Sequence, residues 1–562
     1  MYSTSKAVLA LAVAVFAAPA VAGVAQGANG VVASRSPLAS DVGIEVMKAG
    51  GNAVDAAVAV GFALAVTYPS AGNLGGGGFM VVRLANGDIV ANDHRETAPA
   101  QASRDMYLDQ KGELVAGLST ASHLAVGVPG TVAGLLDALA AYGTLPREAV
   151  LAPAVKLAKD GFPLPADLAA QFERLRERFA QYPASLRQFT KPGDKPYQVG
   201  DTFRQADLAA TLERIAKNGR ASFYGGRNAD LIVAEMHRSN GLITHQDLMT
   251  YRSVWRAPIR ATYRGYEILS MPPPSSGGAL LAQMLNMLEP FDIGAMGYGE
   301  PATVHLMVEA ERRAYADRAE HLGDPDFYDV PLAMLTAKDY ARERFSDFDP
   351  DLATRSELIG AGTLWPEESP ETTHVSVIDR AGNAVAYTTT LNHGYGSKIV
   401  VDGAGFLLNN EMDDFSAKEN TANTYGLIGR EANAIGPRKR MLSSMTPTIV
   451  LKDGEVVFVT GSPGGSTIIT TVLQVVVNVI DHGMDLDEAV AAPRFHHQWL
   501  PDRVVFEQGA LSPETQSTLA GLGHVNLAEI AFRIGDANSA VRIGDTLIGV
   551  ADPRNPGGAA GF

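Results

Sequence analysis

The sequence predicts a layered protein of α-helices and β-strands, of the α/β or α+β class. Residues 125–345 show mainly helical patterns, whereas from residue 372 onwards short β-like runs alternate with Gly, Asn and Asp turns. No Pro/Ser-rich linker separates the two regions, and no repeat or low-complexity tract interrupts them. Because helices and strands must bury their apolar faces against one another, this order indicates layers of one body.

The N-terminus has the pattern of a secretory signal peptide. Lys6 supplies a positive charge, residues 7–18 form an apolar stretch, and Ala20-Val21-Ala22 matches a small-residue cleavage site. A membrane anchor is the alternative, but the apolar run is shorter than the roughly 20 residues needed to span a bilayer. We therefore expect residues 1–22 to be removed and the mature protein to be periplasmic or secreted.

The composition excludes several classes of function. The chain has no cysteine, so it has no disulfides, thiolate nucleophile or Cys-ligated metal centre. The formal net charge of −16 argues against general nucleic-acid binding. A chain of 562 residues can bury a core large enough to be stable without disulfides.

Residues 38–66 are predicted to form two consecutive helices. The first, LASDVGIEVMKAGG, ends at a glycine pair, and Asn52 then caps the second, AVDAAVAVGFALAV. The second helix is almost entirely apolar but too short to span a bilayer, which indicates a buried core helix. Further along, the clearest amphipathic helices are LAAQFERLRERFAQY and VHLMVEAERRAYADRAEHL.

Three hairpins are predicted, each with polar or glycine residues at its open end. In the first, FMVVRLANGDIVANDHRE, a two-residue Asn86-Gly87 turn places Arg95 opposite Gly78. A basic side chain would therefore lie beside bare backbone. Taken alone, Arg95 is more typical of a surface salt bridge than of a ligand-binding residue.

The second hairpin, TTHVSVIDRAGNAVAYTTTLN, turns near Ala381. This turn places Thr372 opposite Thr390, with Asn392 just beyond the strand. No Ser/His/Asp triad surrounds these threonines. Without further context, Thr390 is most simply a β-branched strand residue.

The third hairpin, SSMTPTIVLKDGEVVFVTGSPGG, turns at Asp453-Gly454. Ser443 then falls opposite Gly464, and Ser444 opposite Pro463. The serine pair is by itself an ordinary loop feature. The segment GSPGGST has the glycines of a phosphate-binding loop but lacks its lysine, which disfavours nucleotide binding.

Two pairs of residues have side chains that could bind a metal, namely Asp413-Asp414 and His496-His497. Neither pair has companion ligands at the spacing of a metal site, so solvated or capping roles are favoured. These pairs therefore predict no metal site.

With these segments in view, the chain resembles the γ-glutamyltranspeptidases (glutathione hydrolases), members of the N-terminal-nucleophile hydrolases. The resemblance runs from about Val31 to Arg554, and its landmarks occur in family order: GGNAVDAAVA, GNLGGGGFM, DHRETAP, PPPSSGG, TTHVSVID, TLN, LLNNEMDDFS, GPRKRMLSSMTPTIV, TGSPGGSTIITTVLQ and APRFHHQWLPD. It implies an α+β fold, a four-layer αββα sandwich. It also implies an inactive precursor that cuts itself between Glu371 and Thr372, giving subunits of residues 23–371 and 372–562.

The resemblance makes Thr372 the nucleophile, and its chemistry explains why no triad is needed. Cleavage gives Thr372 a free α-amine, which titrates near 7.7–8.0 and can act as a base near neutral pH. By resemblance, Thr390 hydrogen-bonds the Thr372 hydroxyl. Gly464 and Gly465 are expected to form the oxyanion hole, since backbone N–H groups without side chains allow close approach.

The substrate residues also follow from the resemblance. A γ-glutamyl group carries an α-carboxylate, which calls for a cation and hydroxyls, and an α-ammonium, which calls for acceptors and negative charge. The expected carboxylate ligands are Arg95, Ser443 and Ser444, and the expected ammonium ligands are Asn392, Glu411 and Asp414. The family has Gln or Glu at position 411, and this sequence has Glu.

The segment FSAKENTANTYGLIGREA, between Asp414 and Asn433, resembles the family's lid loop, with Tyr425 as its aromatic residue. This lid favours small γ-glutamyl donors such as glutathione, with water or an amino acid or peptide as acceptor. Two alternatives remain open: a β-lactam side-chain (cephalosporin or glutaryl) acylase on the same scaffold, and a non-catalytic periplasmic binding protein.

Overall fold

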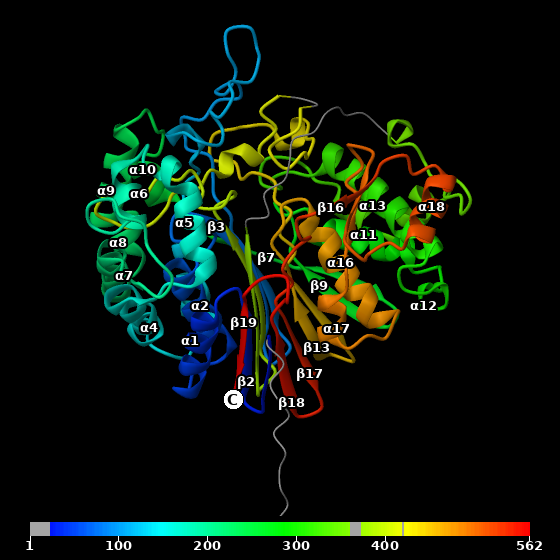
Figure 1. Cartoon of the computed structure of the whole chain (residues 1–562), viewed down its shortest axis with the longest axis horizontal. Coiled ribbons are helices and arrows are strands. Elements are labelled where there is room, and N and C mark those ends of the chain that lie inside the picture. The colour runs from blue at the N-terminus through cyan, green and yellow to red at the C-terminus, as the bar shows by residue number, and fades with distance from the viewer. Residues whose placement is uncertain (1–22, 360–371, 419–420) are drawn as a thin grey trace, which may run out of the picture.

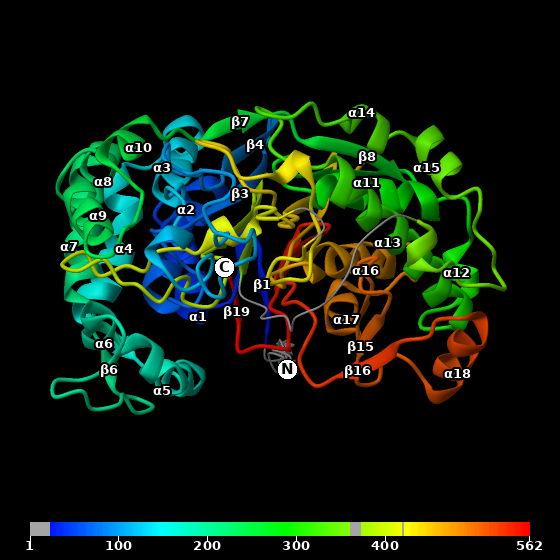
Figure 2. The same cartoon turned by 90° about the horizontal axis from the view of Figure 1, so that it is seen from above.

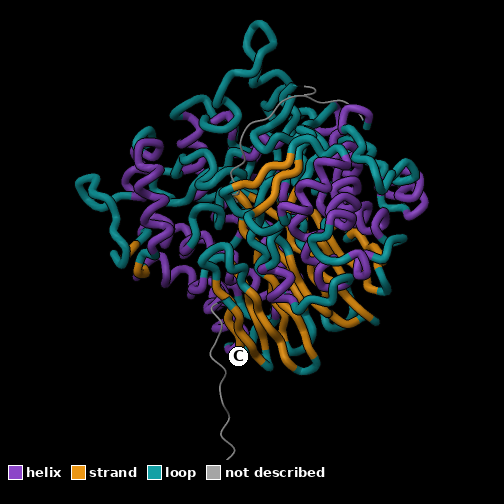
Figure 3. Tube along the Cα trace, turned by 45° about the vertical axis from the view of Figure 1, so that its right-hand side comes forward, coloured by secondary structure: helices purple, strands orange, loops and turns teal. Residues whose placement is uncertain are grey.

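In the computed structural model, which describes residues 23–359, 372–418 and 421–562, two β-sheets pack face to face between two layers of helices (Figure 1). Figure 3 shows the strands running through the middle of the molecule with helices on both sides. The predicted α+β class and αββα layering are therefore confirmed. No helix in the described residues is long and apolar enough to cross a membrane.

The first seven-stranded sheet has the order β19-β2-β10-β11-β3-β4-β7. Its strands are β2 (Gly30–Ser34), β3 (Gly77–Arg83), β4 (Ile89–His94), β7 (Val254–Arg256), β10 (Thr373–Asp379), β11 (Ala384–Thr390) and β19 (Gly558–Gly561). The central strands β10 and β11 come from beyond residue 371, but their outer neighbours β2 and β3 come from before it.

The second seven-stranded sheet has the order β1-β18-β17-β13-β12-β9-β8. Its strands are β1 (Val24–Gly27), β8 (Ile259–Tyr263), β9 (Tyr266–Ser270), β12 (Thr448–Lys452), β13 (Glu455–Thr460), β17 (Ser539–Ile543) and β18 (Thr546–Val550). This sheet also combines the two parts of the chain, since β9 pairs with β12 and β1 pairs with β18. Two smaller sheets contain β14 (Phe495–His496), β15 (Val504–Glu507) and β16 (Leu527–Ile530), and β5 (Phe162–Pro163) and β6 (Thr202–Phe203).

The helices form the two outer layers, which Figure 2 shows on opposite sides of the molecule. One layer contains α1 (Pro37–Lys48), α2 (Ala53–Thr67), α3 (Thr131–Tyr142), α4 (Arg147–Asp160), α5 (Ala166–Phe179), α6 (Pro183–Phe189), α7 (Ala206–Asn218), α8 (Arg220–Tyr224), α9 (Arg227–His237) and α10 (His245–Thr250). The other contains α11 (Gly277–Leu288), α12 (Ile293–Met296), α13 (Pro301–His321), α14 (Leu332–Leu335), α15 (Lys338–Arg344), α16 (Thr467–Ile480), α17 (Leu486–Ala491) and α18 (Pro513–Leu522).

Alternation along the strands explains why there are four layers. Side chains of successive strand residues point to opposite faces of a sheet. On β11, Val385 and Tyr387 pack in the core beneath α2, whereas Ala384 and Ala386 pack in the core between the two sheets. Both faces are thus apolar and buried, so each sheet needs a partner on both sides.

The two N-terminal helices agree with the prediction. Asn52 caps α2, accepting hydrogen bonds from the backbone of Val54 and Asp55, and Asp55 bonds back to the Asn52 N–H. All residues of α2 are buried, as expected for an apolar core helix. The prediction that residues 125–345 are mainly helical is confirmed, but it did not include the short strands β5 to β9, of which β8 and β9 pair as a hairpin.

The predicted register is confirmed for one hairpin and wrong for the other two. Thr373 pairs with Thr389, which is the register that places Thr372 opposite Thr390. Gly78, however, pairs with His94 rather than with Arg95, because the loop after Leu84 has three residues instead of two. Arg95 therefore lies one position beyond the end of β4.

In the third hairpin a β-bulge between Val450 and Leu451 shifts the register by one residue. The ladder ends at Thr448 and Thr460, so the predicted pairing of Ser443 with Gly464 is wrong. Ser443 instead bonds through its backbone to the segment before α11, donating to Pro274 O at 2.8 Å.

Candidate active site

The hairpin of β10 and β11 brings Thr372 and Thr390 together. Thr372 lies directly before β10, is 6% exposed, and donates from Oγ1 to Oγ1 of Thr390 at 3.4 Å. Thr390 Oγ1 also accepts from the Asn392 N–H at 2.8 Å. Asn392 adopts a φ of 73°, a left-handed conformation that Asn tolerates better than most residues. The chain thereby turns away immediately after β11.

Thr372 lines a cavity of about 20 Å³, room for roughly one water. Most of the sequence-predicted residues line it too: Arg95, Thr390, Asn392, Glu411, Asp414, Tyr425, Ser443, Ser444 and Gly465. Gly464 is the exception, since it adjoins the cavity through Gly465 without lining it. The open ends of all three hairpins therefore meet, which the sequence alone did not establish.

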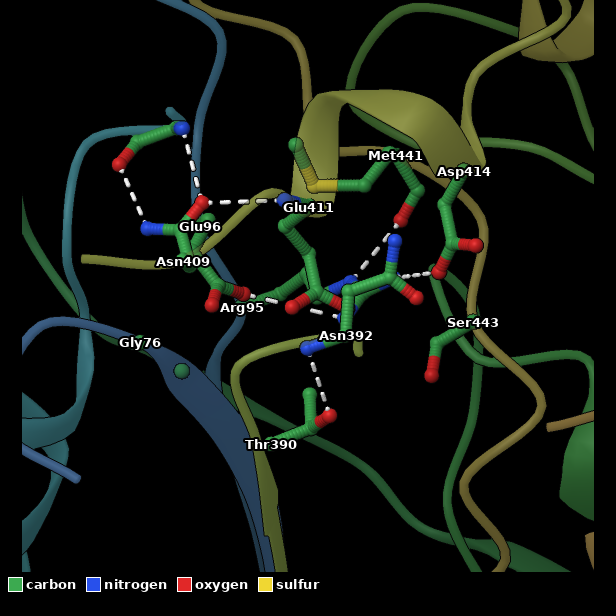
Figure 4. Close-up of polar contacts among 12 residues, drawn as sticks. Gly76, Arg95, Glu96, Thr390, Asn392, Asn409, Glu411, Asp414, Met441 and Ser443 are labelled. Carbon is green, nitrogen blue, oxygen red and sulfur yellow. Dashed lines mark hydrogen bonds and ion pairs between the residues drawn. The ribbon is translucent and has the colours of Figure 1, made fainter. Parts of the chain in front are cut away.

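Arg95 lines this cavity, and its side chain is fully buried. Its guanidinium donates from Nη1 to Glu411 and from Nη2 to Asp414 (Figure 4). Nε donates to the carbonyl oxygen of Met441 at 3.2 Å, and Glu96 lies 3.7 Å from Nη1. Burial lowers the pKa of Arg95, but these carboxylates outweigh it and hold the pKa above its usual value.

Three carboxyl groups therefore surround one guanidinium. Burial raises the pKa of Glu96 to about 7, of Glu411 well above its usual range and of Asp414 above its usual value, although Arg95 opposes each shift. The Cβ of any residue at position 77 would lie 2.4 Å from Oε2 of Glu96, so Gly77 leaves room for that carboxyl. Glu411 and Asp414 therefore form an acidic side of the cavity, next to the Arg95 cation.

The other side of the cavity carries hydroxyl groups and a second arginine. Ser443 and Ser444 are both buried, and Arg318 of α13 donates to Ser444 Oγ at 3.3 Å and to Ser276 Oγ at 3.0 Å. No carboxylate within the described residues forms an ion pair with Arg318. Burial lowers the Arg318 pKa to about 10, so it remains a cation at neutral pH.

The glycine pair and the aromatic residue of the predicted lid are in contact. Gly464 and Gly465 have φ values of 134° and 54°, and a Cβ at position 465 would lie 2.4 Å from the Tyr425 ring. Within the described residues, neither glycine N–H donates a hydrogen bond. Tyr425 is 5% exposed and donates from its hydroxyl to the Asn392 carbonyl at 2.7 Å.

Sequence reasoning missed two charged residues of the site: Arg318, which lines the cavity, and Glu96, which lies behind Arg95. Glu96 directly follows Arg95 in DHRETAP, so a second charge beside a predicted ligand was the available signal. Arg318 gave no comparable signal, because arginines on an amphipathic helix usually face solvent. Only its burial and its hydrogen bonds to Ser276 and Ser444 reveal its place.

His374, which follows Thr372 and Thr373, lies in the core of the sheet and does not line the cavity. His374 is fully buried, bonds to Thr388 and Ser376, and burial lowers its pKa to about 3. The two candidate metal pairs bond to protein groups: Asp413 accepts from Ser119, and His496 contacts Thr470. Glu371, the residue before the predicted cleavage site, lies outside the described residues, as does the predicted signal peptide.

Comparisons with known proteins agree with this geometry. The family model described as gamma-glutamyltranspeptidase matches residues 39–562. The chain is 52% identical over 531 residues to a glutathione hydrolase proenzyme of Escherichia coli K12, covering 94% of this chain and 90% of the relative.

Two solved structures are also similar to this chain. A cephalosporin acylase from Bacillus halodurans matches with a TM-score of 0.84 at 27% identity, covering 99% of both chains. A gamma-glutamyltranspeptidase from Helicobacter pylori matches with a TM-score of 0.57 at 48% identity, covering 58% of this chain and 93% of that one. These neighbours share the N-terminal-nucleophile hydrolase type of fold. The chain belongs to the gamma-glutamyltranspeptidase family.

Proposed function

We propose that the protein is a self-processing γ-glutamyltransferase and glutathione hydrolase. The observation that carries this proposal is the position of Thr372 at a cavity whose other residues offer both charge signs. The carboxylates of Glu411 and Asp414 suit an α-ammonium, while Arg95 suits an α-carboxylate. A γ-glutamyl group is a ligand that carries both charges at one carbon atom and a reactive carbonyl two methylenes away.

The active form is a heterodimer made from one precursor. Cleavage between Glu371 and Thr372 yields subunits of residues 23–371 and 372–562 after removal of residues 1–22, and the enzyme works in the periplasm or outside the cell. The sheet order supports this arrangement, because each of the two large sheets combines strands from both subunits. The name of the Escherichia coli relative, a proenzyme, is consistent with it.

In the mechanism, the free α-amine of Thr372 takes the proton of its own hydroxyl, which attacks the γ-carbonyl. Thr390 accepts a hydrogen bond from Thr372 Oγ1 and fixes its direction. The developing oxyanion is stabilised by the N–H groups of Gly464 and Gly465. The γ-amide C–N bond then breaks, and the leaving amine takes the proton held by the Thr372 α-amine. Water or an amino-acid or peptide amine attacks the resulting ester, which frees the Thr372 hydroxyl. No metal or organic cofactor is needed for these steps.

Substrate binding exchanges ion pairs inside the cavity. Arg95 is paired with Glu411 and Asp414, and the space of about 20 Å³ beside them is smaller than a glutamyl group. The substrate carboxylate replaces these partners at Arg95 with help from the Ser443 and Ser444 hydroxyls. Its ammonium in turn pairs with Glu411, Asp414 and the Asn392 side chain. The charges of Arg95, Glu411 and Asp414 are thereby compensated before and after binding.

This exchange also distinguishes the two alternatives. A glutaryl side chain has no α-ammonium, so a glutaryl acylase would offer the carboxylates of Glu411 and Asp414 no cation to bind. A relative named acylase is 40% identical over 506 residues, against 52% over 531 residues for the glutathione hydrolase proenzyme. A binding protein would bind glutamate without turnover and would not need the Thr372–Thr390 contact.

The testing experiment compares the purified protein with Thr372→Ala on a denaturing gel, with Thr373→Ala as matched control. Thr373 is a buried neighbour that lies outside the cavity. We expect two bands for wild type and Thr373→Ala, the smaller beginning TTHVS, and one band without γ-glutamyl-p-nitroanilide hydrolysis for Thr372→Ala. A single uncut band in wild type, with glutamate binding, would favour the binding protein. Cleavage without γ-glutamyl release would favour the acylase.

A further inference from the structure

A second and larger cavity also reaches Thr372. Its volume is about 450 Å³, and Thr372 is the one described residue that lines both this cavity and the small one. Its walls come from distant parts of the chain: helix α5, the loop before β17 and the loop between β18 and β19. The proposed nucleophile thus stands between two spaces of very different size.

The walls of the larger cavity are unusually rich in arginine. Arg35 is already paired, lying 3.3 Å from Asp536 and 3.5 Å from Asp167. Arg554 is likewise held by neighbouring carboxylates. By contrast, Arg174 on α5 and Arg533 before β17 form no ion pair with any described residue. Two solvent-exposed guanidinium groups therefore border the cavity with their charge uncompensated.

The proposed reaction determines what must occupy this space. With the glutamyl group in the small cavity and its carbonyl at Thr372, the amine portion of the substrate extends away from that cavity. The larger cavity is the space next to Thr372 with room for a dipeptide. The amine portion of glutathione is a dipeptide that ends in a carboxylate, and a peptide acceptor ends in the same group. A carboxylate is the partner that an arginine fork without an ion pair recognises best, and Arg533 otherwise donates to the Pro553 carbonyl at 3.3 Å.

We propose that this cavity, called here the peptide site, binds the C-terminal carboxylate of the leaving and accepting peptide through Arg174 and Arg533. The proposal rests on the proposed function. In the transfer step the bound peptide's neutral α-amine attacks the ester carbonyl, so that a C–N bond forms and the C–O bond to Thr372 breaks. The amine's proton passes through the Thr372 α-amine to the released hydroxyl.

The test uses the processed enzyme and three donors that differ in the amine portion. Glutathione carries the carboxylate, glutathione C-terminal amide lacks its charge, and γ-glutamyl-p-nitroanilide has no such group. The variants are Arg174→Gln, Arg533→Gln and their combination. Arg178→Gln is the matched control, because Arg178 is an exposed arginine on the same helix outside the cavity.

We expect the double variant to lose about tenfold in kcat/KM for glutathione, a typical effect for charge-assisted hydrogen bonds weakened by solvent. Hydrolysis of the anilide should stay within twofold of wild type, as should all activities of Arg178→Gln. Wild type should prefer glutathione to its amide by a similar factor, and the double variant should lose this preference. With the anilide as donor, the KM for glycylglycine as acceptor should rise about tenfold.

Two results would overturn the proposal. One is a double variant that still prefers glutathione to the amide as wild type does, since the carboxylate would then bind elsewhere. The other is an equal loss with all three donors, which would indicate a structural role. Failure of the proposed function looks different, because wild type itself would then cleave neither glutathione nor the anilide.

Discussion

Replacing Arg95 with lysine should separate the bidentate geometry of this residue from its charge. The arginine bonds two carboxylates at once, through Nη1 to Glu411 and through Nη2 to Asp414. A lysine ammonium is a point charge and can satisfy one of them well. The variant therefore keeps the cation and loses one charged hydrogen bond, whether the partner is a protein carboxylate or that of the substrate.

The size of the effect follows from this single loss. A hydrogen bond to a charged group contributes about 1.5–3 kcal/mol, which corresponds to a decrease of about 10- to 150-fold in kcat/KM. Because one buried carboxyl group is left without its cation, the unfolding free energy should fall by about 1–3 kcal/mol as well. Self-cleavage should persist, since Arg95 does not contact Thr372.

The assay is steady-state hydrolysis of γ-glutamyl-p-nitroanilide together with a thermal melt. Arg313→Lys is the matched control, because Arg313 is equally buried and bonds Glu309 at 2.5 Å and Asp347 at 2.7 Å outside the cavity. We expect it to lose stability and keep kcat/KM. An Arg95→Lys enzyme within threefold of wild type would refute the bidentate role. Equal activity losses in both variants would point to stability alone.

Three further changes test other parts of the site. Gly465→Ala should lower kcat at least tenfold, because its Cβ would lie 2.4 Å from the Tyr425 ring; unchanged kcat in a stopped-flow assay would argue against close approach there. Tyr425→Phe removes the 2.7 Å hydrogen bond to the Asn392 carbonyl and should raise the donor KM a few fold, with kcat as the internal reference. Glu96→Gln tests the buried carboxyl whose pKa burial raises to about 7. The folded wild type retains that proton between the usual pKa near 4.5 and about 7, so its stability should fall as pH rises through this window. The variant should lose less melting temperature between pH 5 and pH 8, and equal losses would contradict the assignment.

The sequence predicted individual helices more reliably than the register of the hairpins. Capping by Asn52 and the apolar character of α2 were legible because they depend on local residues. The hairpin registers depended on turn length and on a bulge at Val450, and neither has a unique sequence signature. The four-layer arrangement came from the family resemblance, since composition alone left the class open.

The sequence predicted the site residues that lie within recognisable motifs. It missed a residue that reaches the site only through the way the chain folds. Arg95, Asp414 and the serine pair lie in landmark segments, and the structure brings them to one cavity. Arg318 reaches the same cavity from the middle of α13, which reads as an ordinary amphipathic helix. The peptide site was equally invisible, because its walls come from segments hundreds of residues apart.

The strands of the two future subunits are combined in both large sheets. β10 and β11, which bring Thr372 to Thr390, are flanked by β2 and β3, so the completed sheet around this pair contains strands from both sides of the predicted cleavage site. A chain that misfolds would not form this arrangement and would stay whole. Cleavage before Thr372, seen as two bands on a gel, would thus report correct assembly. The two subunits would then stay associated, because separating them would break the strand pairing in both large sheets.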